Sequence, residues 1–356
     1  MSRSFRISVA SFLLSLIIIF APACPAPNDP SPYGVNGTLR GLAEGYVLAR
    51  QSGFKWVRVF LPWSRLQTSP GGAIDWTGPV LLGPGCGIPA QSADQVINEA
   101  FNANMSILVV LQSTPCWAKV GGGSGGAGCE NAVPVASHFQ AFAAAAVARY
   151  DAKVRAWELW NEPNFDAEFL GSAAQYRTNV LAPGFDGIRS ASNSAFIMAP
   201  TIMRGDFFSP EKSEALGDWL LDSEGNLVRD INAITFHAYS ESTATIETVA
   251  SNSGNFAQLH GNKVTWMTEV GWATGTVGSE CPHGDGSKIV SALDLVHNPS
   301  VPNLAKVFVF SLHDRTKAAC DRECKYGLLT DTGEPKPRYD VVKSWVCSQP
   351  DGACDP

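Results

Sequence analysis

The sequence predicts an α/β fold, a single (β/α)8 TIM barrel. The 356 residues exceed the usual length of one domain, but barrels of this type reach this size as one unit. Hydrophobic residues make up 45% and charged residues 17%, which supports a large buried core and argues against disorder. From Tyr33 onward, apolar runs of strand length alternate with amphipathic runs of helix length, about eight times in all, as βαβ units require.

In the first half of the chain, turn residues separate the expected elements. Gly53 ends the first helix, Pro62 opens a long loop after the second strand, and the alanine-rich run before Tyr150 is the most regular helix. We expect strands at Tyr33–Asn36, Lys55–Leu61, Ile107–Leu111 and Val154–Trp160, and helices at Leu39–Gln51, Ala93–Asn104 and Val135–Tyr150.

The second half repeats the pattern and needs no second domain. We expect strands at Phe196–Ala199, Ala233–His237, Val264–Glu269 and Val307–Leu312, and a last helix that begins at Tyr339. A glycine-rich stretch, 121–128, lacks the Lys-Ser/Thr pair that follows a phosphate-binding loop, so we interpret it as a flexible loop.

The N-terminus is typical of an export signal. Arg3 and Arg6 precede an apolar run over 9–20, too short to span a bilayer comfortably, and Ala21-Pro22-Ala23 follows it. We therefore expect residues 1–23 to be a signal peptide and the chain to be secreted or held at the cell surface.

Cys24 leaves two outcomes open for the exported chain. Cleavage after Ala23 would expose Cys24 for lipid attachment, as in bacterial lipoproteins, although Ala21 stands where such signals usually carry leucine. Setting Cys24 aside leaves an even number of the 9 cysteines, which suits disulfides outside the cytosol. Ordinary cleavage with one spare thiol is the alternative. In both cases 24–32 is a Pro-rich tether and the barrel spans 33–356.

Two cysteine pairs would close short surface loops: Cys116 with Cys129, and Cys347 with Cys354. Zinc is a weaker interpretation of these residues. Cys320 and Cys324 have a ligand-like spacing, but no second Cys-x-x-Cys or nearby His-x-x-x-His completes four ligands. We expect no metal site and no cofactor.

The charge of the chain limits its partners. A formal net charge of −7 without a basic stripe excludes nucleic acid and an anionic membrane surface as natural partners, so the only membrane contact we expect is a lipid anchor at Cys24. A neutral substrate fits this composition.

Two glutamates stand at the ends of apolar strands, where TIM barrels carry their catalytic residues. Glu162 stands in WELWNEPN, where Pro163 cannot continue a central strand, and Glu269 stands in VTWMTEVGW, released by Gly271. Both would lie at the carboxyl ends of their strands, on opposite sides of one barrel mouth. Glycoside hydrolysis uses such a pair, one carboxylic acid to protonate the leaving oxygen and one carboxylate to attack the sugar.

Further polar residues on the strands fit the same mouth. Arg58 would keep Glu269 ionised, or would instead form a structural ion pair with Glu158. His237 and Tyr239 share one side of their strand and could donate hydrogen bonds to the nucleophile and the substrate; a satisfied core histidine is the alternative for His237.

Aromatic residues past the strand ends suit sugar stacking. Trp63, Trp117 and Trp272 follow strands, so we expect their indole faces to line the cleft, with Trp160 beneath it. The chain has 10 tryptophans, and core filling must explain several of the others.

Together these residues resemble the clan A retaining glycoside hydrolases. VRVFLPWSRLQTSPGGAIDW and YGLLTDTGEPKPRYDVV look most like family thirty-nine and its relatives in family five. The resemblance implies a TIM barrel that cleaves a carbohydrate, with Glu162 as acid/base, Glu269 as nucleophile and Asn161 on the 2-hydroxyl of the substrate. Where many relatives carry a tryptophan on strand eight, this chain reads FVFSLHD, which leaves Phe310 or His313 to support the sugar.

Two other functions remain as hypotheses. A catalytically silent barrel would bind glycans with its carboxylates as hydrogen-bond acceptors. A metal-dependent barrel hydrolase would need a His-x-His on the first strand, and Tyr33–Asn36 offers no imidazole.

Overall fold

A computed structural model describes residues 31–37, 43–78, 91–122, 128–206, 210–274, 286–315, 325–352 and 354. The expected signal peptide, Cys24 and most of the tether lie outside these residues, as do Cys320 and Cys324. None of the helices within the described ranges has the length and apolar character needed to cross a membrane.

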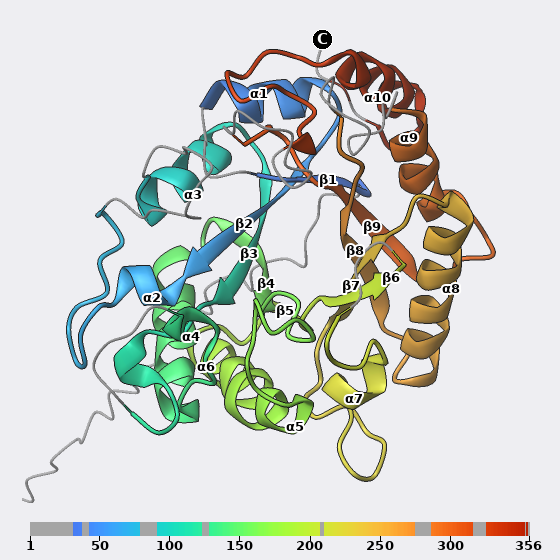
Figure 1. Cartoon of the computed structure of the whole chain (residues 1–356). Helices are drawn as coiled ribbons and strands as arrows, with labels where there is room; N and C mark the ends of the chain where they lie inside the picture. Colours follow the sequence, from blue (N-terminus) through green and yellow to red (C-terminus); the bar gives the residue numbers. More distant parts are fainter. Residues whose placement is uncertain are drawn as a thin grey trace, which may run out of the picture.

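Parallel strands form a closed barrel, as the sequence predicts (Figure 1). The strands are β1 (Tyr33–Asn36), β2 (Trp56–Pro62), β3 (Ser106–Gln112), β4 (Val154–Leu159), β5 (Phe196–Met198), β6 (Ile202–Gly205), β7 (Ala233–Tyr239), β8 (Val264–Val270) and β9 (Leu304–Val309). They pair in the order β5-β4-β3-β2-β1-β9-β8-β7-β6, and β5 also pairs with β7, which closes the ring.

Strand β6 is the one strand that the sequence did not predict. It follows β5 within a few residues and occupies the same position in the barrel, since β5 pairs with the start of β7 and β6 with the rest of β7. Pro200 lies between them and has no N–H for a ladder, so one barrel strand is divided into two pieces.

Helices surround the strands in Figure 1. They are α1 (Ala43–Gln51), α2 (Trp63–Leu66), α3 (Ala93–Asn102), α4 (Ala136–Tyr150), α5 (Ala173–Tyr176), α6 (Ala182–Ala191), α7 (Leu216–Leu220), α8 (Thr243–Leu259), α9 (Ser287–Leu293) and α10 (Pro337–Ser348). A π-helical turn, Arg177–Leu181, joins α5 to α6. The last helix begins two residues before the predicted Tyr339, because proline suits the first helical turn.

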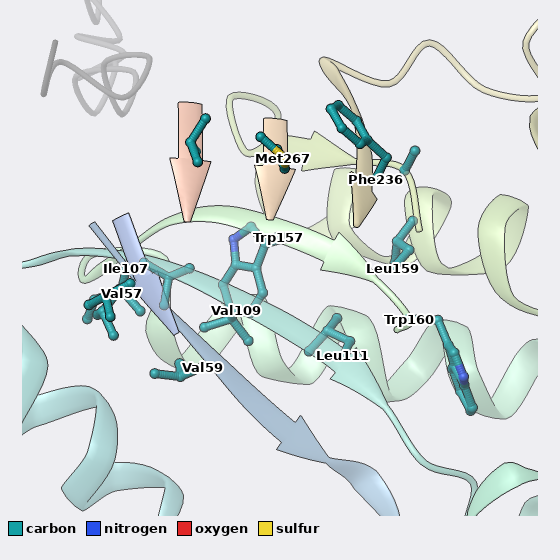
Figure 2. Packing of buried hydrophobic residues seen from close by; sticks show 14 of the residues in the cluster. Val57, Val59, Ile107, Val109, Leu111, Trp157, Leu159, Trp160, Phe236 and Met267 are labelled. Carbon is teal, nitrogen blue, oxygen red and sulfur yellow. The ribbon is translucent and has the colours of Figure 1, made fainter. Parts of the chain in front are cut away.

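Alternation along the strands divides the core into an outer and an inner part. Outward-facing residues such as Val57, Val109 and Trp157 belong to the large cluster between strands and helices (Figure 2). A separate cluster fills the barrel: Trp56, Leu108, Ala156, Met198, Ala233, Trp266 and Phe308. Gly34 completes this layer, because a Cβ there would lie 2.4 Å from the ring of Phe308.

A buried lysine explains why β9 begins three residues before the predicted Val307. Lys306 looks unlike a core residue in sequence, but its ammonium lies 4.6 Å from the ring centre of Trp56 and donates to the carbonyl of Ser31. The strand therefore includes a charged residue that sequence patterning treats as a break.

Both expected disulfides are present. Cys116 pairs with Cys129, and Cys347 pairs with Cys354. The first closes the loop that follows β3, and the second joins α10 to the residues after it.

Candidate active site

The turn after β4 brings Glu162 to the carboxyl end of the barrel. Trp160 and Glu162 have positive φ angles of 81° and 38°, which are uncommon for residues with a Cβ. The turn points Trp160 outward, where it packs on Phe139 of α4 and on Phe169; Figure 2 shows it beyond the end of β4. Trp160 is therefore a core residue and does not lie beneath the cleft, whereas the Glu162 side chain keeps 18% exposure.

An irregularity in β8 turns Glu269 into the barrel. Trp266 points inward and Met267 outward, so strict alternation would also point Glu269 outward. The register shifts between Met267 and Val270 relative to β9, as in a β-bulge, and the Glu269 carboxylate contacts Arg58 inside the mouth.

Arg58 joins the two acidic residues that the sequence offered as alternative partners. Its Nε lies 2.7 Å from Glu158 and its Nη1 lies 2.6 Å from Glu269. Burial alone would lower the pKa of Arg58, but the two carboxylates outweigh it and raise the pKa. Arg58 thus forms the structural ion pair with Glu158 and also places its positive charge against the Glu269 carboxylate. Glu158, which also accepts a hydrogen bond from Thr201, has a defined role as the second anion of this network.

The same guanidinium orients Asn161. Nη2 of Arg58 donates to Oδ1 of Asn161 at 2.9 Å, which assigns the amide oxygen to the arginine. The amide nitrogen of Asn161 is therefore the donor that remains for other partners.

Tyr239 hydrogen-bonds to the second carboxylate oxygen of Glu269. Its hydroxyl donates to Oε2 at 2.8 Å, while Arg58 holds Oε1. Burial and the Glu269 charge raise the pKa of Tyr239 well above its usual value, so the phenol keeps its proton.

His237 lies between the two glutamates. Its Nδ1 is 2.5 Å from Oε1 of Glu162, and its Nε2 is 3.5 Å from Oε1 of Glu269. Burial lowers the pKa of His237 to about 3, so the imidazole is neutral near pH 7. His237 is therefore neither remote from the site nor directed only at Glu269.

The two glutamates are close enough to act on one bond. Oxygen atoms of Glu162 and Glu269 and a nitrogen of His237 lie within 4.8 Å of one another. Retaining glycosidases separate their carboxyls by about 5 to 5.5 Å, and inverting enzymes by about 6.5 to 9.5 Å. The same three groups could ligate a cation, but Arg58 already places a positive charge 2.6 Å from Glu269, which opposes metal binding.

Residues 37–285 match the family Cellulase (glycosyl hydrolase family 5). The chain belongs to this family. No curated protein sequence matches this family 5 chain.

Solved structures share the fold of this family 5 chain at low identity. A family 39 glycoside hydrolase from Bacteroides cellulosilyticus WH2 has 15% identity and a TM-score of 0.61, over 89% of this chain and 63% of that one. A family 39 beta-xylosidase from Caulobacter crescentus has 14% identity and a TM-score of 0.63, over 89% and 71%. A family 5 protein from Streptomyces cattleya, in complex with Manb1-4GlcNAc, has 16% identity and a TM-score of 0.57, over 90% and 82%.

The prediction that Trp63 and Trp272 line the cleft with open indole faces is wrong. Trp63 begins α2 and is fully buried, with its ring stacked on Phe142 of α4. Trp272 is 3% exposed and donates its indole N–H to the carbonyl of Ser240. A sugar needs an open ring face, and burial in the outer core removes it.

Trp117 keeps a partly exposed side chain, whereas His313 is buried. Trp117 is partly buried, edge-on to Trp63, and its indole donates to the carbonyl of Gln67. His313 is buried against α1, where a Cβ on Gly45 would lie 2.4 Å from its ring. His313 is therefore excluded as the sugar support.

Three phenylalanines contact residues of the site. Phe60 is partly exposed on β2, with the Arg58 guanidinium 4.7 Å from its ring centre. Phe165 and Phe310 are partly buried against the cluster that contains Tyr239. Period-two alternation from Arg58 could have identified Phe60, whereas Phe165 comes from a loop with no such signal.

Gln112 is a polar residue that the sequence analysis missed. It ends β3 opposite Pro62 of β2, and its Oε1 is buried without a hydrogen-bond partner among the described residues. Gln112 lies on the same face of β3 as Leu108, which points into the barrel. Period-two alternation along the strand could therefore have identified Gln112 as an inward-facing residue.

Proposed function

We propose that this family 5 chain is a retaining glycosidase that cleaves O-glycosidic bonds of an oligosaccharide or polysaccharide by double displacement. Glu162 is the acid/base and Glu269 is the nucleophile. The observation that carries the proposal is the approach of both carboxyls within 4.8 Å at one barrel mouth, with Arg58 and Tyr239 directed at Glu269.

In the first step the Glu269 carboxylate, which accepts hydrogen bonds from Arg58 and Tyr239, attacks the anomeric carbon. Glu162 gives its proton to the leaving oxygen as the glycosidic bond breaks, and the sugar is left as an ester on Glu269. In the second step Glu162 takes a proton from water, and the hydroxide oxygen attacks the anomeric carbon and releases Glu269. Asn161, oriented by Arg58, offers its amide N–H₂ to the sugar ring.

The substrate class we propose is a neutral glycan. Phe60 packs beside Arg58 and Phe310 packs against the cluster that contains Tyr239, and Arg58 and Tyr239 both donate to Glu269. No cation beyond Arg58 contacts Glu269 among the described residues.

We also propose that the chain is exported and works outside the cytosol. The N-terminal signal pattern and two disulfides support this location, because such bonds persist in oxidising compartments. Attachment through Cys24 would hold the enzyme on a membrane surface.

The test uses Glu269→Gln and Glu162→Gln on a panel of aryl glycosides and polysaccharides. We expect Glu269→Gln to lose at least about 10⁴-fold in kcat with unchanged folding. Glu162→Gln should lose most activity on poor leaving groups and little on dinitrophenyl glycosides in the first step, because those leave without a proton. Product NMR should show retention at the anomeric centre.

Glu241→Gln is the matched control, since Glu241 is an exposed carboxylate paired with Lys288 and should keep full activity. Near-normal turnover by Glu269→Gln would refute the assignment. Tight glycan binding without hydrolysis across the panel would favour the silent binding barrel instead.

A further inference from the structure

His237 makes two contacts, one to each catalytic carboxyl, and they constrain where a proton can sit. A 2.5 Å contact between Nδ1 and Oε1 of Glu162 requires a hydrogen between the two atoms. Nε2 has no hydrogen-bond partner among the described residues and faces Oε1 of Glu269 at 3.5 Å. Each nitrogen of this ring therefore faces a carboxyl oxygen.

A neutral imidazole has one N–H, so only two arrangements are available. In the first, Nδ1–H donates to an ionised Glu162, and the lone pair of Nε2 points at the Glu269 carboxylate. In the second, a protonated Glu162 donates to Nδ1, and Nε2–H points at Glu269. The first arrangement sets a lone pair against an anion in a buried site, whereas the second sets an N–H dipole toward it.

The surrounding charges also favour the second arrangement. Arg58 supplies one positive charge, which Glu158 and Glu269 already share. Tyr239 is a neutral phenol. Lys212, a described cation near the Glu162 loop, donates to the Pro163 carbonyl and is paired with Asp166 at 2.7 Å. Ionising Glu162 would bring a third carboxylate close to Glu158 and Glu269, which among the described residues share the single guanidinium of Arg58.

We infer that His237 is a positioning residue that couples the two catalytic carboxyls. Its Nε2–H faces the ionised Glu269, which leaves Nδ1 as an acceptor and holds the proton on Glu162 in the resting enzyme. This inference rests on the proposed function, because it concerns the acid form that the first step consumes. The imidazole stays neutral and neither gains nor loses a proton in this role, consistent with a pKa lowered by burial.

The first test reads the tautomer without any turnover. The chain has 6 histidines, and the difference between the wild type and His237→Gln identifies the ¹⁵N signals of His237. We expect the full, unliganded chain near pH 7 to show a protonated Nε2 and an unprotonated Nδ1. A protonated Nδ1 would overturn the inference, whatever the enzyme's activity.

The second test is the pH profile of kcat/KM, which falls on the alkaline side as Glu162 loses its proton. His237→Phe removes the acceptor of the Glu162 proton, so the alkaline limb should move to lower pH, by about one pH unit. If Nδ1–H instead donated to an ionised Glu162, its removal would move the limb to higher pH. An equal loss of activity at every pH would show a structural role only, and either result would overturn the inference.

Two controls separate this inference from the proposed function. His297→Phe changes a partly exposed histidine hydrogen-bonded to Tyr33, and its profile should match the wild type. With a dinitrophenyl glycoside under conditions where the first step limits the rate, the alkaline limb should disappear in all variants, because no proton is needed. A chain that hydrolyses no glycoside would refute the proposed function, while the ¹⁵N spectrum would still decide the tautomer.

Discussion

At the scale of single residues, the site is organised around the buried charge of Arg58. Every nitrogen of its guanidinium donates: Nε to Glu158, Nη1 to Glu269 and Asn36, and Nη2 to Asn161. A buried charge is costly unless it is paired and fully hydrogen-bonded, and a planar group with a fixed fork of donors meets this condition better than lysine. The second anion, Glu158, stands four residues before Glu162 in the sequence and anchors the arginine that contacts Glu269.

Trp63 provides a residue-scale prediction that separates core from cleft. Trp63→Ala should lower the free energy of unfolding by about 3 to 5 kcal/mol, because it removes a fully buried indole stacked on Phe142. The KM of the folded variant should not change. Denaturant unfolding and Michaelis kinetics check both points.

Phe310→Ala is the comparison for that variant. Phe310 is only partly buried beside Tyr326, so its loss should raise KM several-fold with a smaller loss of stability. If Trp63→Ala kept wild-type stability and had a raised KM, Trp63 would be a substrate-binding residue of the cleft and not a core residue.

At the scale of elements, irregular backbone geometry positions Glu162 and Glu269, the two residues proposed to be catalytic. The bulge in β8 and the positive-φ turn after β4 each interrupt a regular strand at its carboxyl end. Regular alternation would point Glu269 toward the helices, and the interruption directs it toward Arg58. Strand ends can carry such features because the ladder no longer has to continue beyond them.

Strand β1 provides the element-scale prediction. Gly34→Ala should cost about 1 to 3 kcal/mol, because the new Cβ would meet the Phe308 ring at 2.4 Å inside the closed barrel. The matched control is Gly217→Ala in α7, where a Cβ meets nothing closer than 3.4 Å. That variant should be neutral or stabilised by up to about 1 kcal/mol. Equal stability losses in the two variants, measured by urea unfolding, would contradict this account of the inner layer.

At the scale of the whole molecule, closure of the barrel brings together residues that are distant in sequence. The contact between Arg58 and Glu269 spans 211 residues, and that between His237 and Glu162 spans 75. The site is therefore complete only when β1 has paired with β9 and β5 with β7. Partial unfolding of any part of the ring should remove activity together with structure.

The disulfide Cys116–Cys129 gives a prediction at this scale. Replacing both cysteines by serine frees a loop of 13 residues and should destabilise the fold by about 3 kcal/mol, mainly through the entropy of the unfolded chain. Thermal unfolding should show a lower midpoint, and the glutamate network should keep its activity below the transition. An unchanged midpoint would mean that this bond does not restrain the unfolded state.

The sequence by itself determined the barrel, most strand positions and the two glutamates. These follow from local properties: the spacing of apolar runs, the turn residues between them, and carboxylates placed at or just past the carboxyl ends of strands. It also indicated Arg58, His237 and Tyr239, because alternation and strand order are local as well.

Only the tertiary structure decided which way these side chains face and what they touch. Strict alternation gives the wrong side for Trp160 and Glu269, since a turn and a bulge change the direction of the chain. Trp63 and Trp272 look like open platforms in sequence, but α4 covers one and the Ser240 carbonyl binds the other. The position of His237 between Glu162 and Glu269 depends on three strands that meet only when the barrel closes, and no local pattern encodes that distance.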